Sequence, residues 1–274
     1  MQTIGFSLEG SYALPQDQVL TILRNVGFSA ISPAWQQDAP LTQTAEAAAK
    51  AGLQLQSLHA PYRGTPGMWQ PETPALLPQL LRALEDCAAC AIPTLVVHAW
   101  GGHNYTFREE TLYFGHFHKL VDSACAKGVQ IAFENLEGPE YLDALMAHFS
   151  DCPQVGLCWD SGHQLCYTPH RDFLADYGNR LMMTHLNDNF GIRHPDGQLQ
   201  STDDLHLLPY HGQANWPQYI QQLKQSRKQD ILNFELKMRP KGDRCTTDLY
   251  SHLPLEQYLL QAYESASRIA KAYF

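Results

Sequence analysis

The chain has 274 residues, of which 44% are apolar and 17% are charged, and this balance argues against an intrinsically disordered protein. Its 19 Lys and Arg against 28 Asp and Glu give a formal net charge of -9, which argues against a protein that tracks the phosphate backbone of nucleic acid. It contains no run of about 18 uncharged apolar residues, and its first residues show no basic segment followed by an apolar run. We therefore expect a cytoplasmic protein that is not bound to a membrane.

Short apolar runs alternate with longer amphipathic stretches, and this alternation repeats about eight times along the chain. We expect strands at residues 3–8, 30–33, 53–59, 94–98, 129–134, 156–160, 181–186 and 231–236. We expect helices at residues 15–26, 42–51, 73–91, 108–127, 139–148, 170–177, 215–226 and 254–272, several of them opened by Pro or a capping residue. Eight strand–helix units in a chain of this length predict an α/β fold with one domain over residues 1–274, a (β/α)8 TIM barrel.

A doubly wound open sheet would show a similar alternation, but it usually carries a glycine-rich phosphate loop after its first strand. The segment GFSLEGSY, which contains the end of the first expected strand, is not such a loop. The longest expected loop runs over residues 187–213, after the seventh strand, and is rich in Asp, His, Gly and Pro. Long loops on that side of a barrel are usually functional, so this one is expected to take part in the site.

The seven cysteines are an odd number scattered along the chain, which is typical of a reducing compartment rather than of a disulfide framework. Cys87 and Cys90 have the CxxC spacing of redox pairs, but they lie well inside a helical pattern and not at a helix N-terminus. We interpret them as small apolar residues of a helix that packs on the core.

Six of the expected strands end in a histidine or a carboxylate after an apolar run. In chain order these residues are His59, His98, Glu134, Asp160, His185 and Glu235. The C-terminal strand ends of a TIM barrel meet at one mouth, where active sites are built. A single histidine there is more often structural than a metal ligand, but a ring of six acids and imidazoles would be costly to bury without a cation. Imidazole and carboxylate together suit a divalent ion such as Zn, Mn or Co, and thiolate ligation is not indicated.

Two short motifs extend this ring. Asp160-Ser-Gly-His163 places a second imidazole about one turn after the sixth strand, and Asp204-Leu-His206 lies in the long loop. Each motif also has an ordinary interpretation, with His163 as a capping or surface residue and Asp204 as a solvated acid. Aromatic rings follow strands two to four, and they either wall a polyol pocket or pack over the mouth as part of the fold: Trp35, Tyr62, Trp69 and Trp100. Trp216 is expected to open the seventh helix.

Taken in order, the segments SLHAPY, VVHAW, FENLEG, CWDSGH, THLND, DLHLLPYHGQANW and FELK resemble the xylose isomerase-like TIM barrel superfamily over nearly the whole chain. That superfamily joins sugar and sugar-phosphate isomerases and epimerases with the endonuclease IV-type apurinic/apyrimidinic endonucleases. Similarity to its ketose 3-epimerases implies that one catalytic metal is held by Glu134, Asp160, His185 and Glu235. It also implies that Glu134 and Glu235 form the acid/base pair and that His163 and Glu140 contact substrate hydroxyls.

The endonuclease-like pattern is matched more fully, because those epimerases tend to carry an arginine where His206 stands. It implies that up to three zinc ions are held by His59, His98, Glu134, Asp160, His163, His185, Asp204, His206 and Glu235. Shared ligands do not fix a mechanism, and cations near the predicted mouth are limited to Arg63, Arg108, Arg193, Lys237, Arg239 and Lys241. These can anchor one phosphate or carboxylate of a small substrate, whereas a DNA enzyme needs many phosphate contacts.

The sequence therefore favours a metal-dependent sugar or sugar-phosphate isomerase or epimerase that transfers a proton through an enediolate. Its cofactor is expected to be one or more divalent ions, Zn or Mn, and its partner a small sugar rather than nucleic acid or a membrane. A multi-zinc phosphodiester hydrolase like endonuclease IV is the alternative. A metal-binding relative without catalysis ranks last because both glutamates are present. The particular sugar and the oligomeric state stay open at this point.

Overall fold

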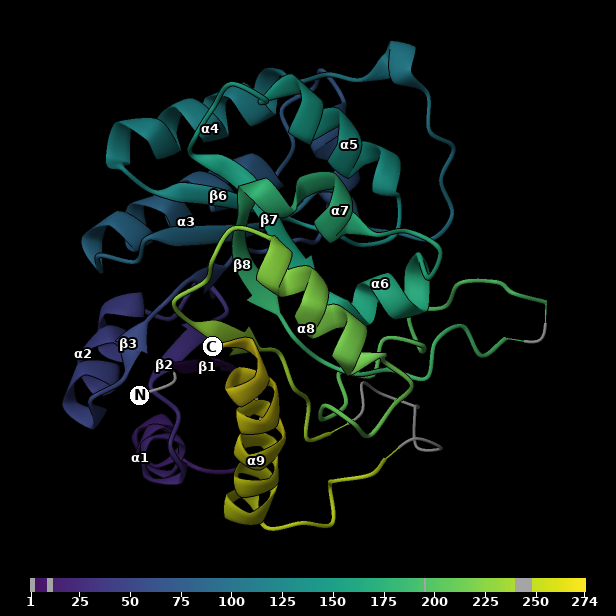
Figure 1. Cartoon of the computed structure of the whole chain (residues 1–274). Coiled ribbons are helices and arrows are strands. Elements are labelled where there is room, and N and C mark those ends of the chain that lie inside the picture. Colours follow the sequence, from purple (N-terminus) through teal and green to yellow (C-terminus); the bar gives the residue numbers. More distant parts are fainter. Residues whose placement is uncertain (1–2, 9–11, 195, 240–247) are drawn as a thin grey trace.

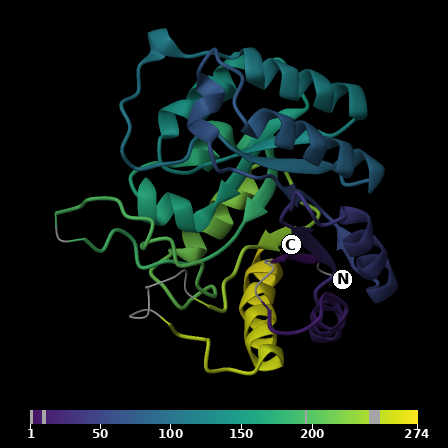
Figure 2. The same cartoon turned by 180° about the vertical axis from the view of Figure 1, so that it is seen from behind.

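The computed structural model describes residues 3–8, 12–194, 196–239 and 248–274. Its strands are β1 (Ile4–Leu8), β2 (Ala30–Pro33), β3 (Gln54–Leu55), β4 (Leu58–His59), β5 (Thr94–His98), β6 (Gln130–Glu134), β7 (Val155–Asp160), β8 (Leu181–His185) and β9 (Leu232–Phe234). Its α-helices are α1 (Gln16–Val26), α2 (Leu41–Ala51), α3 (Leu76–Ala89), α4 (Gly115–Lys127), α5 (Pro139–His148), α6 (Ser161–Tyr167), α7 (Phe173–Tyr177), α8 (Trp216–Gln225) and α9 (Leu255–Tyr273). Short 3-10 helices are η1 (Thr65–Trp69), η2 (Glu109–Thr111) and η3 (Gly178–Arg180). The helices surround the strands in Figures 1 and 2.

The strands pair in parallel in two runs, ordered β3-β2-β1-β9 and β4-β5-β6-β7-β8. Isolated parallel bridges join the runs at both seams, between Ala34 and His59 and between Leu186 and Phe234. Strands β3 and β4 are the two halves of the third expected strand, so all eight strand positions of the barrel are filled. The (β/α)8 TIM barrel predicted from the sequence is therefore confirmed.

Side-chain alternation along the strands separates an inner from an outer core. The inner layer is formed by Val96, Ala132, Cys158 and Met183, one from each of four adjacent strands. Each stands two residues before a strand end, so the side chains of His98, Glu134, Asp160 and His185 lie on the same inner side. The outer faces of the strands pack on the apolar faces of the helices, and α9 closes the ring between α1 and α8.

The third strand is interrupted where the sequence pattern predicted continuous pairing. Both intervening side chains are buried and polar, and they bond to other parts of the barrel, the residue before β9 and a residue of the neighbouring strand β2. Gln56 Nε2 donates to the Ile231 carbonyl at 3.2 Å, and Ser57 Oγ donates to Ser32 Oγ at 2.9 Å. Because buried polar groups need partners, these bonds are kept at the expense of a regular ladder.

Helix α4 begins later than predicted, at Gly115 rather than at residue 108. The preceding aromatic residues pack inward, with the Phe114 ring 3.9 Å from the His148 ring and stacked on it. Tyr113 lies so close to Gly115 that a Cβ atom there would be 2.3 Å from the tyrosine hydroxyl. Tertiary packing therefore sets the start of this helix. In α3, Cys87 is fully buried, as expected for a packing residue, and burial raises the pKa of its thiol.

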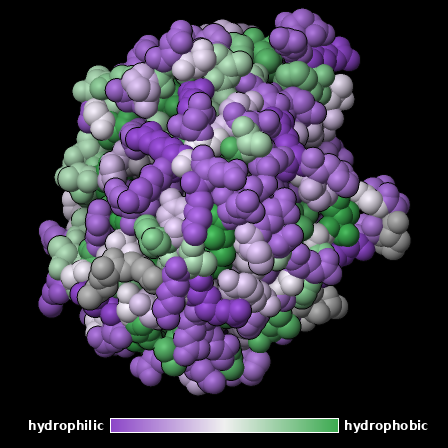
Figure 3. Space-filling model, in the orientation of Figure 1, coloured by the Kyte–Doolittle hydropathy of each residue, from purple (hydrophilic) through white to green (hydrophobic). Residues whose placement is uncertain are grey.

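The face drawn in Figure 3 is mostly hydrophilic, with hydrophobic residues scattered over it in small groups. Within the described part of the chain, no helix is both long and apolar enough to cross a membrane.

The long segment between β8 and α8 projects from the barrel body in both cartoon views and is anchored at its base by one carboxylate. Asp188 is fully buried, and its Oδ1 accepts hydrogen bonds from the backbone N–H groups of Asn189 and Ala214, both at 2.9 Å. Its Oδ2 accepts from the Tyr210 N–H at 3.0 Å and from Nε1 of Trp216 at 2.9 Å. Trp216 opens α8, as predicted.

Replacing Asp188 with Ala is expected to lower the free energy of unfolding by about 3–5 kcal/mol, because several buried donors lose their acceptor together. Urea denaturation followed by circular dichroism measures this change. Asp196→Ala, at an exposed position in the same segment, is the matched control and should leave the transition midpoint unchanged. An unchanged midpoint for Asp188→Ala would show that the segment is held by other contacts.

Candidate metal centre

The predicted ligands stand at the same height in the barrel because the strands that carry them are adjacent and paired in register. His98 is paired with Glu134, and Asp160 is paired with His185. His59 ends β4, and Glu235 follows β9. The barrel thus brings all six strand-end residues to one mouth, as the sequence predicted.

The first ligand group consists of Glu134, Asp160, His185 and Glu235, whose ligand atoms all lie within 4.8 Å of one another. Nδ1 of His185 is 3.0 Å from Oε1 of Glu134 and 2.9 Å from Oε2 of Glu235. All four side chains are buried. Among the described residues, Oε2 of Glu134 and Oε2 of Glu235 are buried, and they have imidazole nitrogens within 3.4 Å but no hydrogen bond of regular geometry. Buried carboxylate oxygens beside an imidazole nitrogen fit a divalent cation.

The second group shares Glu134 with the first and adds two histidines. Nε2 of His59 and Nε2 of His98 are 3.2 Å apart, and they lie 3.4 and 3.2 Å from Oε2 of Glu134. Nδ1 of His59 must carry hydrogen because its partner at 2.9 Å, the Ala60 carbonyl, can only accept. Nε2 is therefore the ring atom of His59 that faces Glu134 and can serve as a ligand.

The third group is formed by His163, Asp204 and His206. Nε2 of His163 is 3.6 Å from Oδ1 of Asp204, and Nε2 of His206 is 2.9 Å from Oδ2. Nδ1 of His163 donates to the Asn135 carbonyl and Nδ1 of His206 donates to the Glu235 carbonyl, both at 3.1 Å. These bonds orient the two rings so that both Nε2 atoms face Asp204. His206 has a φ of 49°, a left-handed conformation that costs energy for a residue with a Cβ and is more common at functional sites.

Helix α6, which the sequence pattern did not predict, carries His163 into the site. Asp160 caps this helix, since its Oδ1 accepts the backbone N–H of His163 at 2.7 Å. Nδ2 of Asn187 donates to both Asp160 oxygens at 3.0 Å. The helix lies so close to Asn187 that a Cβ at Gly162 would be 1.8 Å from Oδ1 of Asn187. The turn between β7 and α6 thus fixes two candidate ligands at once.

The buried charges of the site shift one another's pKa values. Burial opposes ionisation of Glu134, but His185, His163 and His59 hold its pKa well below the usual value. Burial also opposes protonation of His163, but Asp160 and Asp204 raise its pKa well above the usual value. Burial raises the pKa of Asp160. The carboxylates therefore need a positive counter-charge, which either protonated imidazoles or a bound cation can supply.

Cys158 is a neighbour that sequence reasoning did not single out as part of the site. Its thiol belongs to a group with Glu134 and His185 in which the ligand atoms lie within 4.8 Å. Burial raises the pKa of this thiol to about 12, so in the absence of a bound metal it is protonated at neutral pH.

A cavity of about 920 Å³ opens over these groups. Its lining includes His59, His98, Glu134, His163, Asp204, His206 and Glu235. Of the predicted substrate-binding aromatic residues, Tyr62 lines this cavity, and its ring stacks on His98 at 4.6 Å between centroids. A cavity of this size can hold a sugar.

The structure does not bring the other predicted aromatic residues, or Glu140, to the lining of this cavity. Trp35 donates from Nε1 to Asp86 at 2.7 Å, Trp69 to the Ala99 carbonyl at 2.9 Å, and Trp100 to the Gly102 carbonyl at 2.8 Å. Glu140 accepts from the Tyr105 hydroxyl at 2.9 Å. The polar group of each of these side chains is thus bonded to another group of the protein.

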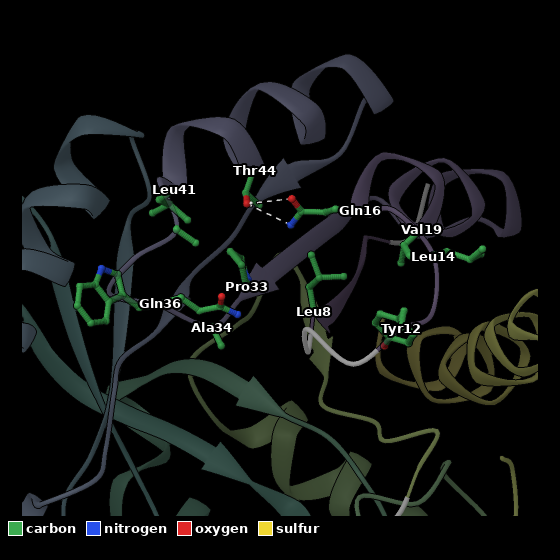
Figure 4. A pocket seen from close by; sticks show the side chains of 12 residues that line it. Leu8, Tyr12, Leu14, Gln16, Val19, Pro33, Ala34, Gln36, Leu41 and Thr44 are labelled. Carbon is green, nitrogen blue, oxygen red and sulfur yellow. Dashed lines mark hydrogen bonds between the residues drawn. The ribbon is translucent and has the colours of Figure 1, made fainter.

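Trp35 lines a second cavity instead, of about 270 Å³, between the segments that follow β1 and β2. Figure 4 shows Gln16 and Thr44 hydrogen bonded to each other at this cavity, among apolar side chains that include Leu8 and Leu41. Its lining side chains are apolar or uncharged, so this cavity lacks the groups that proton transfer requires.

Glu137 and His103 line the cavity, although sequence reasoning did not single them out. Glu137 is buried in the cavity wall, and its Oε1 accepts the Gly102 N–H at 2.6 Å. His103 lines the wall beside Tyr167, at 5.3 Å between ring centroids. Glu137 could have been considered because it lies in the FENLEG segment, three residues after Glu134. Nothing in the sequence distinguishes His103 from an ordinary loop histidine.

The cations that the sequence placed near the mouth divide into those that line the cavity and those that do not. Arg63, Lys237 and Arg239 line it. Arg193 pairs with Asp203 at 3.2 Å, and Arg108 is exposed outside the lining. Lys241 lies outside the described residues.

Comparison with known proteins agrees with this architecture. A family model described as xylose isomerase-like TIM barrel matches residues 20–258, and the chain belongs to this family. The uncharacterized protein y4fM of Sinorhizobium fredii is 29% identical over 264 aligned residues, covering 80% of each chain. The structure of IolI protein with a bound zinc atom matches with a TM-score of 0.75 at 18% identity, over 100% of this chain and 99% of that one. D-psicose 3-epimerase with D-tagatose, from Clostridium cellulolyticum H10, matches with a TM-score of 0.70 at 12% identity, over 99% of each chain. At such identities these two structures share the fold with this chain.

Proposed function

We propose that this protein is a metal-dependent isomerase or epimerase that transfers a proton at a carbon next to a carbonyl in a sugar or sugar derivative. The observation that carries this proposal is the placement of two buried carboxylates, Glu134 and Glu235, beside one atom, Nδ1 of His185, at 3.0 and 2.9 Å. Both also line the 920 Å³ cavity, where a small substrate can reach them. The fold similarity to a D-psicose 3-epimerase supports the same reaction class.

A divalent cation, Zn or Mn, held by Glu134, Asp160, His185 and Glu235 would polarise the substrate carbonyl and stabilise the enediolate charge. One glutamate removes the carbon-bound proton and becomes neutral, and the other returns a proton that it has taken up from solvent in the cavity. Neighbouring imidazoles hold the pKa of both well below the usual value although burial opposes this, so each is ionised and can act as the base. Glu134 and Glu235 come from strand positions separated by β7 and β8, and we expect them to approach a bound substrate from different sides. Return of the proton to the opposite face gives epimerisation, and its return to the neighbouring carbon gives isomerisation.

A second candidate function is metal-dependent phosphodiester hydrolysis. The observation that favours it is the presence of the two further ligand groups, His59–His98–Glu134 and His163–Asp204–His206, which would hold additional zinc ions. Several metal ions in one site can activate water and stabilise a leaving oxygen. The few cations around the cavity argue against a nucleic-acid substrate.

Proton exchange with solvent separates the two functions. We expect the metal-loaded protein, incubated in D₂O with a panel of free and phosphorylated ketoses and aldoses, to introduce carbon-bound deuterium into one class of sugar. Nuclear magnetic resonance detects the deuterium and the epimer or isomer formed. An abasic-site DNA duplex is tested in parallel. Cleavage of that duplex, lost with EDTA and without deuterium entering any sugar, would overturn the proposal in favour of hydrolysis.

A further inference from the structure

Three cationic side chains line the cavity that contains the metal ligands. Arg63 comes from the connection after β4, and Lys237 and Arg239 come from the segment after β9. In the order of the barrel, β4 and β9 are separated by β2 and β1. The cations therefore flank the arc of β1 and β2, and the first ligand group stands on the arc from β6 to β9, so the two arcs meet at β9.

Neither arginine is neutralised by another described residue. Arg171 pairs with Asp143 at 2.6 Å and Arg193 pairs with Asp203 at 3.2 Å, but Arg63 and Arg239 take part in no ion pair within the described ranges. Both are exposed at the cavity, in a chain whose formal net charge is -9. Uncompensated guanidinium groups at a cavity wall attract anions and bind them in two-pronged hydrogen bonds.

The proton transfer proposed for the two glutamates does not use these cations. The ligand groups lie at the buried end of the cavity, and the arginines lie at its exposed end. A substrate whose carbonyl lies at the ligand groups would extend toward the arginines. The charge pattern of the cavity is thus suited to a molecule with a polyol or carbonyl end and an anionic end.

We propose that Arg63, Lys237 and Arg239 form an anion subsite, and that the substrate is a sugar derivative bearing one phosphate or carboxylate group. This inference rests on the proposed function and names its substrate class. The two arginines bind the anionic oxygens, and Lys237 adds positive charge to the subsite. Three cations match a single small anion, whereas a nucleic acid needs contacts to many phosphates along its backbone.

The test uses sets of three sugars that differ only at the terminal carbon: the free sugar, its phosphate and its carboxylate. Exchange of each with D₂O is measured on the metal-loaded full chain. We expect a KM for one anionic member at least about tenfold below that of the free sugar, the equivalent of one charged contact. The phosphate and carboxylate arms show which anion is the natural one.

Two variants assign this preference to the arginines. Arg63→Ala and Arg239→Ala should each raise the KM for the anionic member by about tenfold or more and leave the KM for the free sugar unchanged. Arg108→Ala is the matched control, because Arg108 is exposed and does not line the cavity. Equal melting temperatures exclude misfolding as the cause.

The outcomes separate this inference from the proposed function. Equal KM values for the three sugars, or Arg variants that keep the preference, would overturn the anion subsite while proton transfer stands. If none of the sugars exchanges, the proposed function fails. Calorimetric binding of the same anionic sugars to wild type and to Arg239→Ala then decides the subsite, and equal affinities overturn it. Displacement of these sugars by an abasic-site duplex at lower concentration would assign the cations to nucleic acid and also overturn it.

Discussion

Replacing Glu134 with Gln is expected to lower the rate of substrate deuterium exchange by at least about 10³-fold. Glutamine keeps the shape of the side chain but cannot ionise, so it can neither remove the proton nor balance a cation. The position is also shared by the first two ligand groups, where Glu134 lies 3.0 Å from His185 and 3.2 Å from His98. Deuterium incorporation followed by nuclear magnetic resonance, with the metal content of each sample measured, gives the size of the effect.

A pair of variants separates loss of the base from loss of the metal. Asp160→Asn removes a ligand charge but no acid/base group, so saturating Zn or Mn should restore part of its activity. Glu134→Gln should stay inactive under the same conditions. Glu46→Gln, on the exposed side of α2, is the matched control and should behave like wild type. Full exchange by Glu134→Gln would show that this carboxylate is not the acid/base group.

Removal of the bound metal with a chelator is expected to lower the melting temperature by roughly 10 °C. A ligand at about 1,000 times its dissociation constant stabilises the folded state by about 4 kcal/mol, and 1 kcal/mol corresponds to roughly 2–4 °C in a domain of this size. The physical reason is that the buried carboxylates Glu134, Asp160 and Glu235 lose their counter-charge. Differential scanning calorimetry before and after chelation, and after Zn or Mn is restored, measures the shift.

The His185→Ala variant supplies the control for this experiment. His185 contacts both glutamates of the first ligand group, so its removal should abolish the response to added metal. Protein purified without chelators that contains no divalent metal, together with an unchanged melting temperature on metal addition, would show that these residues do not form a metal centre.

The barrel and the convergence of the candidate ligands could be predicted because both follow from local patterns. An apolar run that ends in His or a carboxylate identifies a strand and its mouth-side end together, and the barrel fold then places His98 beside Glu134 and Asp160 beside His185. The start of α4 could not be predicted in this way, since it depends on how the aromatic side chains before it pack.

The aromatic residues show where local sequence stops being informative. Trp35 and Tyr62 both follow a strand, but only Tyr62 lines the large cavity. The difference lies in a partner 51 residues away, because Asp86 accepts the Trp35 indole N–H and holds the ring outside the mouth. Similarly, Tyr105 bonds to Glu140 in the structure, and Glu137 lines the cavity instead. Distant partners of this kind leave no trace in spacing or periodicity.

Asp160 has two roles, and these couple it to a second candidate ligand, His163. Its carboxylate belongs to the first ligand group, and Oδ1 of the same carboxylate caps the helix that carries His163, so a substitution made to retune metal preference would also loosen that helix and displace the imidazole. An engineer who wishes to change the metal of this barrel should therefore start at His59 or His98, whose contacts to Glu134 involve no helix cap, and leave the aspartate in place.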